Sequence, residues 1–286
     1  YLNETVDEYA VRNSIDFGVR VISARWLSAE SVWETVARDG RGQEVRYRSR
    51  LLFMCSGYYR YSAGYTPDLP GLEEFAGTVV HPQLWPDDLD YSNKRVAVIG
   101  SGATAVTLIP AVADKASHVT MVQRSPTYIV SMPSKDRLAN LLNRLMPAAW
   151  AYASTRWRNI RFQNYFYKQA IERPAKTRAY ILKRLRKALK PEIDVEKHFT
   201  PSYDPWTQRL CLVPDSDLFH VLNSGKANVT TGNIARITSD GIEMQDGEKI
   251  EADVLVTATG IQLELLGGVE FFMDDQKLDF SRRFFY

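Results

Sequence analysis

The chain has 286 residues, 45% of them hydrophobic and 24% charged, with a formal net charge of +2 at pH 7. This length allows one large core or two smaller ones, and the nearly balanced charge gives no bulk electrostatic reason to expect a nucleic-acid partner. No apolar run reaches the roughly 18–20 residues that span a bilayer, so we expect no membrane association either.

The chain contains two cysteines, Cys55 and Cys211, which lie far apart in sequence. Two distant cysteines form neither a disulfide framework nor a zinc-ligand cluster, and they are typical of a protein of the reducing cytoplasm. We therefore expect a cytoplasmic protein without a metal site.

The first elements in chain order are a helix and several short strands. Helical periodicity over residues 1–13 predicts a helix, and alternating residues 15–21 and 32–36 predict strands. A continuous apolar run at 51–55 is typical of a strand buried on both faces. The stretch 58–77 is rich in Pro, Gly and Tyr, so we expect it to be irregular.

Farther along, the pattern predicts a parallel α/β unit. Residues 95–99 and 119–123 are apolar runs typical of buried strands, and a helix is expected between them from about 103 to 115. This strand–helix–strand order implies parallel strands joined by a right-handed crossover. Short strands are expected over 226–251, followed by another buried strand at 252–256.

Residues 136–189 interrupt this unit with a long helical pattern punctuated by Pro147 and Pro174, which we interpret as a helical insertion. A basic amphipathic helix over 176–190 is predicted to present a solvated charged face, with contact to nucleic acid or to an anionic membrane as the alternative. The aromatic residues within the insertion are predicted to lie in a core. They are Trp150, Tyr152 and Trp157.

A glycine-rich turn follows the first of the buried parallel strands and matches the pattern G-x-G-x-x-G/A. Its six residues are Gly100, Ser101, Gly102, Ala103, Thr104 and Ala105. The first glycine makes the tight turn, the second lets backbone N–H groups approach a pyrophosphate, and the small last residue lets helix and strand pack closely. The positive end of the helix then favours the anion. A coincidental glycine-rich turn is the alternative.

The end of the next strand indicates which dinucleotide binds. NAD sites usually place Asp or Glu there to hold the ribose 2′-hydroxyl, whereas this chain has Arg124 and Ser125. A guanidinium suits a 2′-phosphate, so NADP(H) is favoured; a solvated strand-end charge is the alternative. The other G-x-G, at residues 40–42, lacks the strand and helix around it and predicts a hairpin turn.

A longer pattern precedes the turn. Residues 75–86, from Phe75 through Gly77 and His81 to Trp85 and Pro86, match F-x-G-x-x-x-H-x-x-x-W-P. This resembles the fingerprint of the Baeyer–Villiger monooxygenases, within the flavin-containing monooxygenases. Residues 123–126 and 203–210 resemble the branch that includes the ethionamide-activating monooxygenase.

The resemblance implies an α/β flavoprotein with two dinucleotide-binding domains. It implies a partial FAD-binding domain over 1–90, an NADP-binding domain over 91–135 and 199–251 around a helical insertion at 136–198, and a return to the FAD-binding domain over 252–286. The family's other G-x-G-x-x-G, which binds FAD, is not in this sequence. The chain is therefore expected to be a fragment of a longer enzyme, cut at both ends.

The function implied by the resemblance is a monooxygenase that uses NADPH, FAD and O2 to oxidise a small molecule, which would be a ketone, a sulfide or a thioamide. Arg209 is the implied catalytic arginine that stabilises the anionic peroxide, with a structural ion pair as the alternative. His81 is implied at the site as a link between domains, with a packing role as the alternative. Thr259 and Gly260 are implied as cofactor contacts.

Two other functions remain open at this stage. A pyridine-nucleotide disulfide reductase shares the two-nucleotide architecture but needs a close cysteine pair, which Cys55 and Cys211 do not provide. A non-catalytic NADP-binding module is the other alternative.

Overall fold

The computed structural model describes residues 1–280 and divides the chain into two compact units. The first unit consists of residues 1–63 and the chain from residue 261 onward, and the second of residues 64–260. The chain enters the second unit along strand β4 (Tyr59–Gly64) and leaves it along β15 (Ile261–Leu263), and these two strands pair with each other. The predicted domain boundaries at 90/91 and 251/252 both lie inside the second unit.

The first unit is built on a five-stranded sheet with the order β17-β16-β1-β2-β3. Its strands are β1 (Arg20–Leu27), β2 (Val32–Arg38), β3 (Glu44–Ser49), β16 (Glu270–Met273) and β17 (Gln276–Leu278). Short helices α1 (Leu2–Glu8) and η1 (Arg12–Ser14) precede the sheet. Trp33 packs between Trp26, at 5.5 Å, and Phe271, at 6.2 Å between ring centroids, so aromatic contacts join β1, β2 and β16.

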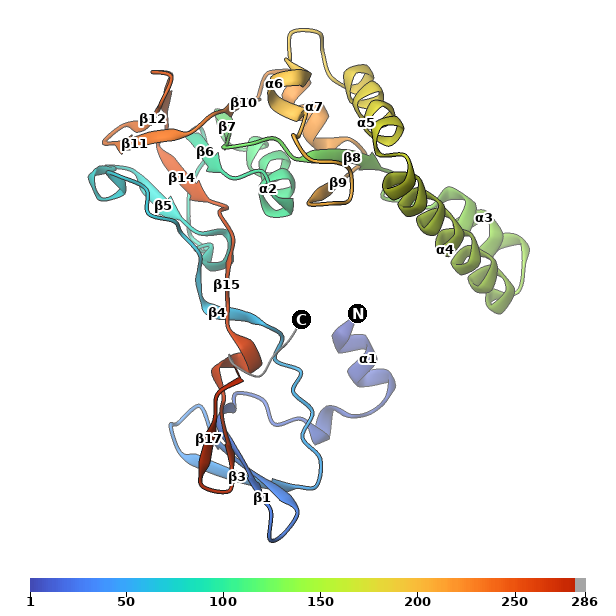
Figure 1. The fold of residues 1–286 in the computed structure, drawn as a ribbon, viewed down its shortest axis with the longest axis vertical. Helices are drawn as coiled ribbons and strands as arrows, with labels where there is room; N and C mark the ends of the chain where they lie inside the picture. Colours follow the sequence, from blue (N-terminus) through green and yellow to red (C-terminus); the bar gives the residue numbers. More distant parts are fainter. Residues whose placement is uncertain (281–286) are drawn as a thin grey trace. The chain divides into compact units, whose positions relative to one another are not determined.

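The second unit is built on a parallel five-stranded sheet with the order β10-β7-β6-β14-β5 (Figure 1). Its strands are β5 (Thr78–Val80), β6 (Arg95–Ile99), β7 (His118–Gln123), β10 (Ala227–Thr231) and β14 (Val254–Thr257). Strands β5 and β14 pair in this one sheet, β14 lying between β5 and β6, so the predicted boundaries fall between strands of the same sheet.

Both faces of this sheet are covered, which explains why its strands are continuous apolar runs. Val96 and Val98 point into a core that includes helix α2 (Ala103–Ala113) and helix α7 (Asp217–Ser224). The alternate residues Ala97 and Ile99 point into a second core made with the antiparallel strands β11 (Ile234–Thr238), β12 (Gly241–Met244) and β13 (Lys249–Glu251).

Between the parallel strands β8 (Tyr128–Met132) and β9 (Leu210–Pro214) lies the predicted helical insertion. It contains α3 (Arg137–Leu145), α4 (Ala148–Glu172), α5 (Pro174–Ala188) and α6 (Val195–Phe199). Pro147 precedes α4 and Pro174 begins α5, as expected for a residue that cannot continue a helix from the preceding turn. Among residues 1–280, none of the helices has the length and apolar character required to cross a bilayer.

Four predictions from the sequence are wrong. The stretch 58–77, expected to be irregular, contains strand β4. Residues 51–55 form no strand, and Leu51 and Phe53 are exposed, because no described element covers them. The predicted strand at 15–21 begins instead at Arg20. Trp150, Tyr152 and Trp157 are not core residues: they are exposed on α4, whose buried residues are Ala151 and Ala170, because the described elements cover little of this helix.

Candidate nucleotide-binding site

The turn between β6 and α2 begins with a backbone conformation that only glycine adopts without strain. Gly100 has φ +140°, and its N–H donates to the carbonyl of Val122 on the neighbouring strand at 2.8 Å. A Cβ at this position would overlap the carbonyl oxygen of Ala258. The first glycine of the motif is therefore required by the sheet itself, with or without a ligand.

The second glycine leaves open space at the start of α2. Gly102 is the N-cap of this helix, and no side chain of the described residues caps its first turn. Ala103 and Thr104 in that turn are exposed. Unpaired N–H groups and the positive end of the helix dipole therefore face solvent, where an anion can reach them. Ala105 is fully buried, as expected for the small third position of the motif.

The Ser101 side chain turns inward. Its hydroxyl lies 3.2 Å from Oγ1 of Thr127 and donates to the carbonyl of Ser125 at 3.3 Å. These bonds tie the turn to the segment after β7. A contact between Ser101 and a nucleotide would therefore use its backbone.

Arg209 reaches this turn although more than a hundred residues separate them in sequence. Strands β8 and β9 pair in parallel with Tyr128 opposite Leu210, which places Arg209 beside Thr127. A Cβ added at Gly102 would lie 3.8 Å from Nη1 of Arg209. A guanidinium thus stands next to the uncapped helix end, and both favour the same negatively charged group.

Two hydrogen bonds hold the loop that carries Arg209. The Tyr128 hydroxyl donates to the carbonyl of Tyr203 at 2.8 Å, and the Tyr203 hydroxyl donates to the carbonyl of Arg209 at 2.8 Å. The two tyrosine rings also meet edge to face at 5.4 Å. The backbone of Arg209 is therefore fixed while its side chain remains exposed. Sequence reasoning missed this tyrosine pair, although Tyr203 is the first residue of the 203–210 stretch that carries the resemblance.

Cys211 also contacts the turn. Its thiol donates to the carbonyl of Ser101 at 3.9 Å, and burial raises the pKa of this thiol. A thiol kept protonated in this way is a poor nucleophile. Its role in the described structure is to pack β9 against the turn.

At the end of β7, the side chains divide between the interior and solvent. The Gln123 amide is buried and donates to the carbonyl of His198 at 2.7 Å and to Oγ1 of Thr231 at 2.8 Å. Arg124 and Ser125 are exposed, and Arg124 has no ion-pair partner among residues 1–280. Gln123 is therefore occupied structurally, and the guanidinium of Arg124 is available for an anionic group.

The long motif over residues 75–86 has mainly structural roles. Phe75 is buried in the core beneath β11–β13. A Cβ at Gly77 would overlap the carbonyl of Asp253, so this glycine lets β5 approach the start of β14. Trp85 packs against the α2 core and meets Tyr91 edge to face at 5.8 Å.

His81 lies beside both the first and the last residue of the second unit, Gly64 and Gly260. Its Nε2 lies 2.9 Å from the carbonyl of Gly260, and its Nδ1 accepts from the N–H of Gln83 at 3.2 Å. With Nδ1 accepting, Nε2 is the donor to the carbonyl of Gly260, so both ring nitrogens are engaged. In this arrangement His81 positions the backbone and has no free nitrogen to act as a base.

Thr259 and Gly260, predicted as cofactor contacts, both form hydrogen bonds with the backbone of Tyr65. The Thr259 hydroxyl donates to the carbonyl of Tyr65 at 2.7 Å, and the carbonyl of Gly260 accepts from the N–H of Tyr65 at 3.1 Å. Gly260 has φ +128°, which favours glycine. Their contact with a cofactor stays a prediction.

We expect the Gly64→Ala substitution to destabilise the second unit by about 1–3 kcal/mol, the usual cost of overpacking. The added Cβ would overlap the imidazole of His81 and break its hydrogen bond with the carbonyl of Gly260. Chemical denaturation measures the free energy of unfolding, and Gly40→Ala is the control because an added Cβ there meets nothing within 4 Å. The double variant Gly64→Ala/His81→Ala should recover part of the loss. Equal stability of Gly64→Ala and the unsubstituted chain would contradict the packing described.

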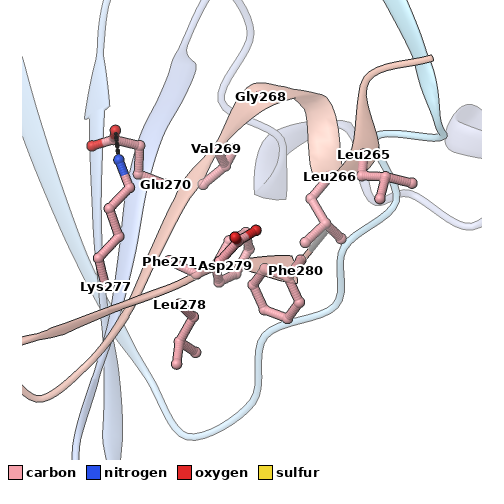
Figure 2. A pocket seen from close by; sticks show the side chains of 10 residues that line it. All are labelled: Leu265, Leu266, Gly268, Val269, Glu270, Phe271, Lys277, Leu278, Asp279 and Phe280. Atoms are coloured by element: carbon pink, nitrogen blue, oxygen red, sulfur yellow. Dashed lines mark hydrogen bonds and ion pairs between the residues drawn. The ribbon is translucent and has the colours of Figure 1, made fainter. Parts of the chain in front are cut away.

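The first unit contains a hollow of its own, shown in Figure 2. Residues of η4 (Leu265–Gly268), β16 and β17 line it, together with Asp279 and Phe280. An ion pair between Glu270 and Lys277 stands at its edge. None of the predicted site residues lines this hollow.

The chain is similar to known proteins over its whole length. A family model described as flavin-binding monooxygenase-like matches residues 1–266. The chain is 46% identical to the FAD-containing monooxygenase EthA of Mycobacterium tuberculosis, over all of this chain and 58% of that protein. It is 44% identical to the probable FAD-binding monooxygenase AlmA of Acinetobacter baylyi, over all of this chain and 57% of that protein. The chain thus spans less than two thirds of the length of these relatives.

Solved structures share the fold. A steroid monooxygenase bound to NADP gives a TM-score of 0.70 at 23% identity, covering 95% of this chain and 57% of that one. Cyclohexanone monooxygenase from Rhodococcus sp. Phi1 bound to NADP+ gives 0.68 at 23% identity, with the same coverage of 95% and 57%. The predicted α/β fold of the flavoproteins with two dinucleotide-binding domains is confirmed.

Proposed function

Because the chain belongs to the flavin-binding monooxygenase-like family, we propose that it forms the NADP(H)-binding part of an NADPH- and FAD-dependent monooxygenase. The observation that carries the proposal is the convergence of Gly102, the uncapped start of α2 and the Arg209 guanidinium at one point. This combination suits a pyrophosphate, which needs close backbone approach and positive charge.

The choice of NADP(H) over NAD(H) rests on Arg124 and Ser125. Both are exposed directly after β7, while Gln123, in the position where an NAD site holds its acidic residue, is buried and engaged. A guanidinium without an ion-pair partner in the described chain can bind a 2′-phosphate through two parallel hydrogen bonds.

FAD is proposed for the complete protein. The described residues offer one dinucleotide turn, and the proposed NADP(H) site uses it. Bound FAD, reduced by NADPH, would supply the transfer of one oxygen atom from O2 to the substrate. Arg209 stands beside the helix end that would hold the pyrophosphate, and its role in stabilising developing negative charge during that chemistry stays a prediction. His81 positions the carbonyl of Gly260.

The proposed substrates are small molecules with a ketone carbonyl or a soft sulfur, such as a sulfide or a thioamide. A related structure carries the name of a cyclohexanone monooxygenase, which supports a ketone. Two isolated cysteines, one exposed and one buried, support a reducing compartment, and we propose the cytoplasm. They also speak against a disulfide reductase, because the buried Cys211 thiol has a raised pKa.

The experiment is a titration of the purified chain with NADPH and NADH, followed by the fluorescence of the reduced nicotinamide, with flavin absorbance recorded before and after addition of FAD. We expect NADPH to bind and NADH to bind at least about tenfold more weakly. No binding of NADPH would overturn the proposal. NADPH binding without FAD uptake would show that this chain by itself is a nucleotide-binding module. In that case, NADPH-dependent O2 uptake in the presence of a ketone would be measured on the complete protein.

A further inference from the structure

A tryptophan three residues before Arg209 occupies a turn position that normally holds glycine. Pro205 precedes Trp206, and the N–H of Thr207 donates to the carbonyl of Asp204 at 3.2 Å, which closes a β-turn. Trp206 has φ +75°, the value that the third residue of a type II turn adopts. A bulky residue is rare in this conformation, which costs free energy unless surrounding contacts hold it.

Helix α4 of the insertion supplies such contacts. The ring of Trp206 meets the rings of Phe166 and Tyr167 edge to face, each at 5.9 Å between centroids. Phe166 is half-buried, and it neighbours Tyr167 on the helix. Edge-to-face pairs stabilise a contact beyond the apolar area that they bury. Two such pairs on one ring attach the turn to α4 and favour the backbone conformation that glycine would adopt more easily.

The loop over residues 203–209 is held by hydrogen bonds at its base and by packing at its tip. At the base, the Tyr203 hydroxyl donates to the carbonyl of Arg209. Among residues 1–280, the hydrogen bonds of residues 204–208 stay within that segment. The tip is held instead by the buried Pro205 and by the contact of the Trp206 ring with α4.

The position of this loop matters because the Arg209 side chain has no ion-pair partner among residues 1–280. Its guanidinium is exposed, and an arginine side chain loses much rotamer freedom when it is ordered. Its place beside Gly102 therefore depends on where the backbone of the loop lies. A loop that is fixed in advance lowers the cost of ordering this charge on an anionic ligand.

We propose that Trp206 is a positioning residue whose contact with α4 holds Arg209 beside Gly102 for nucleotide binding. The inference rests on the proposed binding of NADP(H) at this turn. Helix α4 then affects nucleotide binding through the loop rather than by contact with the nucleotide. The helical insertion, which interrupts the α/β unit along the chain, thereby becomes part of the support of the nucleotide site.

A purely structural tryptophan is the competing explanation, and it predicts a different set of results. If the Trp206 ring only stabilises the insertion, its removal lowers the free energy of unfolding and leaves the affinity for NADPH unchanged. If the ring positions Arg209, its removal weakens NADPH binding, and only while Arg209 is present. Residues that act through one another show such non-additive effects.

The test is titration with NADPH, followed by nicotinamide fluorescence. We expect Trp206→Gly to weaken binding by about threefold to tenfold, and Phe166→Ala/Tyr167→Ala to weaken it by a similar factor. Trp206→Phe keeps an aromatic ring and should bind within about twofold of the unsubstituted chain. In the Arg209→Ala background, Trp206→Gly should add no further loss. Because glycine adopts φ +75° without strain, Trp206→Gly should unfold at nearly the same temperature as the unsubstituted chain.

The matched control is Trp157→Ala, which removes an exposed tryptophan from the same helix and should leave NADPH affinity unchanged. Hydrogen–deuterium exchange of the nucleotide-free chain tests the loop independently: Phe166→Ala/Tyr167→Ala should raise exchange over residues 203–209 and leave that of α2 unchanged. If the unsubstituted chain bound no NADPH, the proposed function would fail, and the exchange would still report whether α4 holds the loop. Unchanged exchange, or an equal loss from Trp206→Gly with and without Arg209, would overturn the positioning role.

Discussion

Replacing Gly102 with alanine is expected to weaken NADPH binding by roughly tenfold to a hundredfold while leaving the free chain folded. The added methyl would occupy the space through which a pyrophosphate reaches the first N–H groups of α2. Hydrogen bonds to a charged group contribute about 1.5–3 kcal/mol each, and 1.4 kcal/mol corresponds to a factor of ten in affinity. In the free chain the methyl meets only Nη1 of Arg209, at an ordinary 3.8 Å.

Two further alanine variants separate ligand binding from folding. Gly40→Ala lies in the hairpin G-x-G and should change neither affinity nor stability, because an added Cβ there meets nothing within 4 Å. Gly100→Ala should lower the free energy of unfolding, since it forces φ +140° on alanine and a clash with Ala258. An affinity of Gly102→Ala equal to that of the unsubstituted chain would show that the pyrophosphate does not approach this backbone.

Replacing Arg124 with alanine is expected to raise the dissociation constant of NADPH by about tenfold to a hundredfold and to change that of NADH by less than about threefold. The guanidinium is exposed and unpaired in the described chain, so its loss costs no internal contact. Only NADPH carries the 2′-phosphate that it would bind. The ratio of the two dissociation constants, measured by nicotinamide fluorescence, is therefore the informative quantity.

Two variants frame this result. Arg124→Lys keeps the charge but loses the planar pair of donors, so it should fall between the unsubstituted chain and the alanine variant. Arg41→Ala removes an exposed arginine from the hairpin turn of the first unit and should leave both dissociation constants unchanged. Equal losses for NADPH and NADH in Arg124→Ala would assign the arginine to a part of the nucleotide that both share.

The apolar runs show how far sequence alone reaches. Residues 95–99 form a buried strand as predicted, because helices and strands cover both faces of their sheet. Residues 51–55 carry the same signal and form no strand. A run of apolar residues indicates that burial would stabilise the segment. It does not indicate which helix or strand would bury it.

In the candidate site, too, the sequence predicts local features but not contacts between distant segments. The turn at 100–105 was predicted with its elements on both sides, because its chemistry is local. The position of Arg209 beside Gly102 depends on the pairing of β8 with β9, which joins segments far apart in the chain. Helical periodicity likewise predicted α4 but assigned Trp150 and Trp157 to a core, because periodicity does not show which side of a helix is covered.

The parallel pairing of β8 and β9 also bears on how this family can diversify. Two adjacent parallel strands need a connection of a dozen or more residues, and here α3 to α6 lie within that connection. The register of Tyr128 with Leu210 and the two tyrosine bonds fix Arg209 locally. Longer or shorter connections change closure entropy only slowly. Substitution and insertion can therefore remodel residues 133–199 for new surroundings while the nucleotide site keeps its geometry, provided that Phe166 and Tyr167 still meet Trp206.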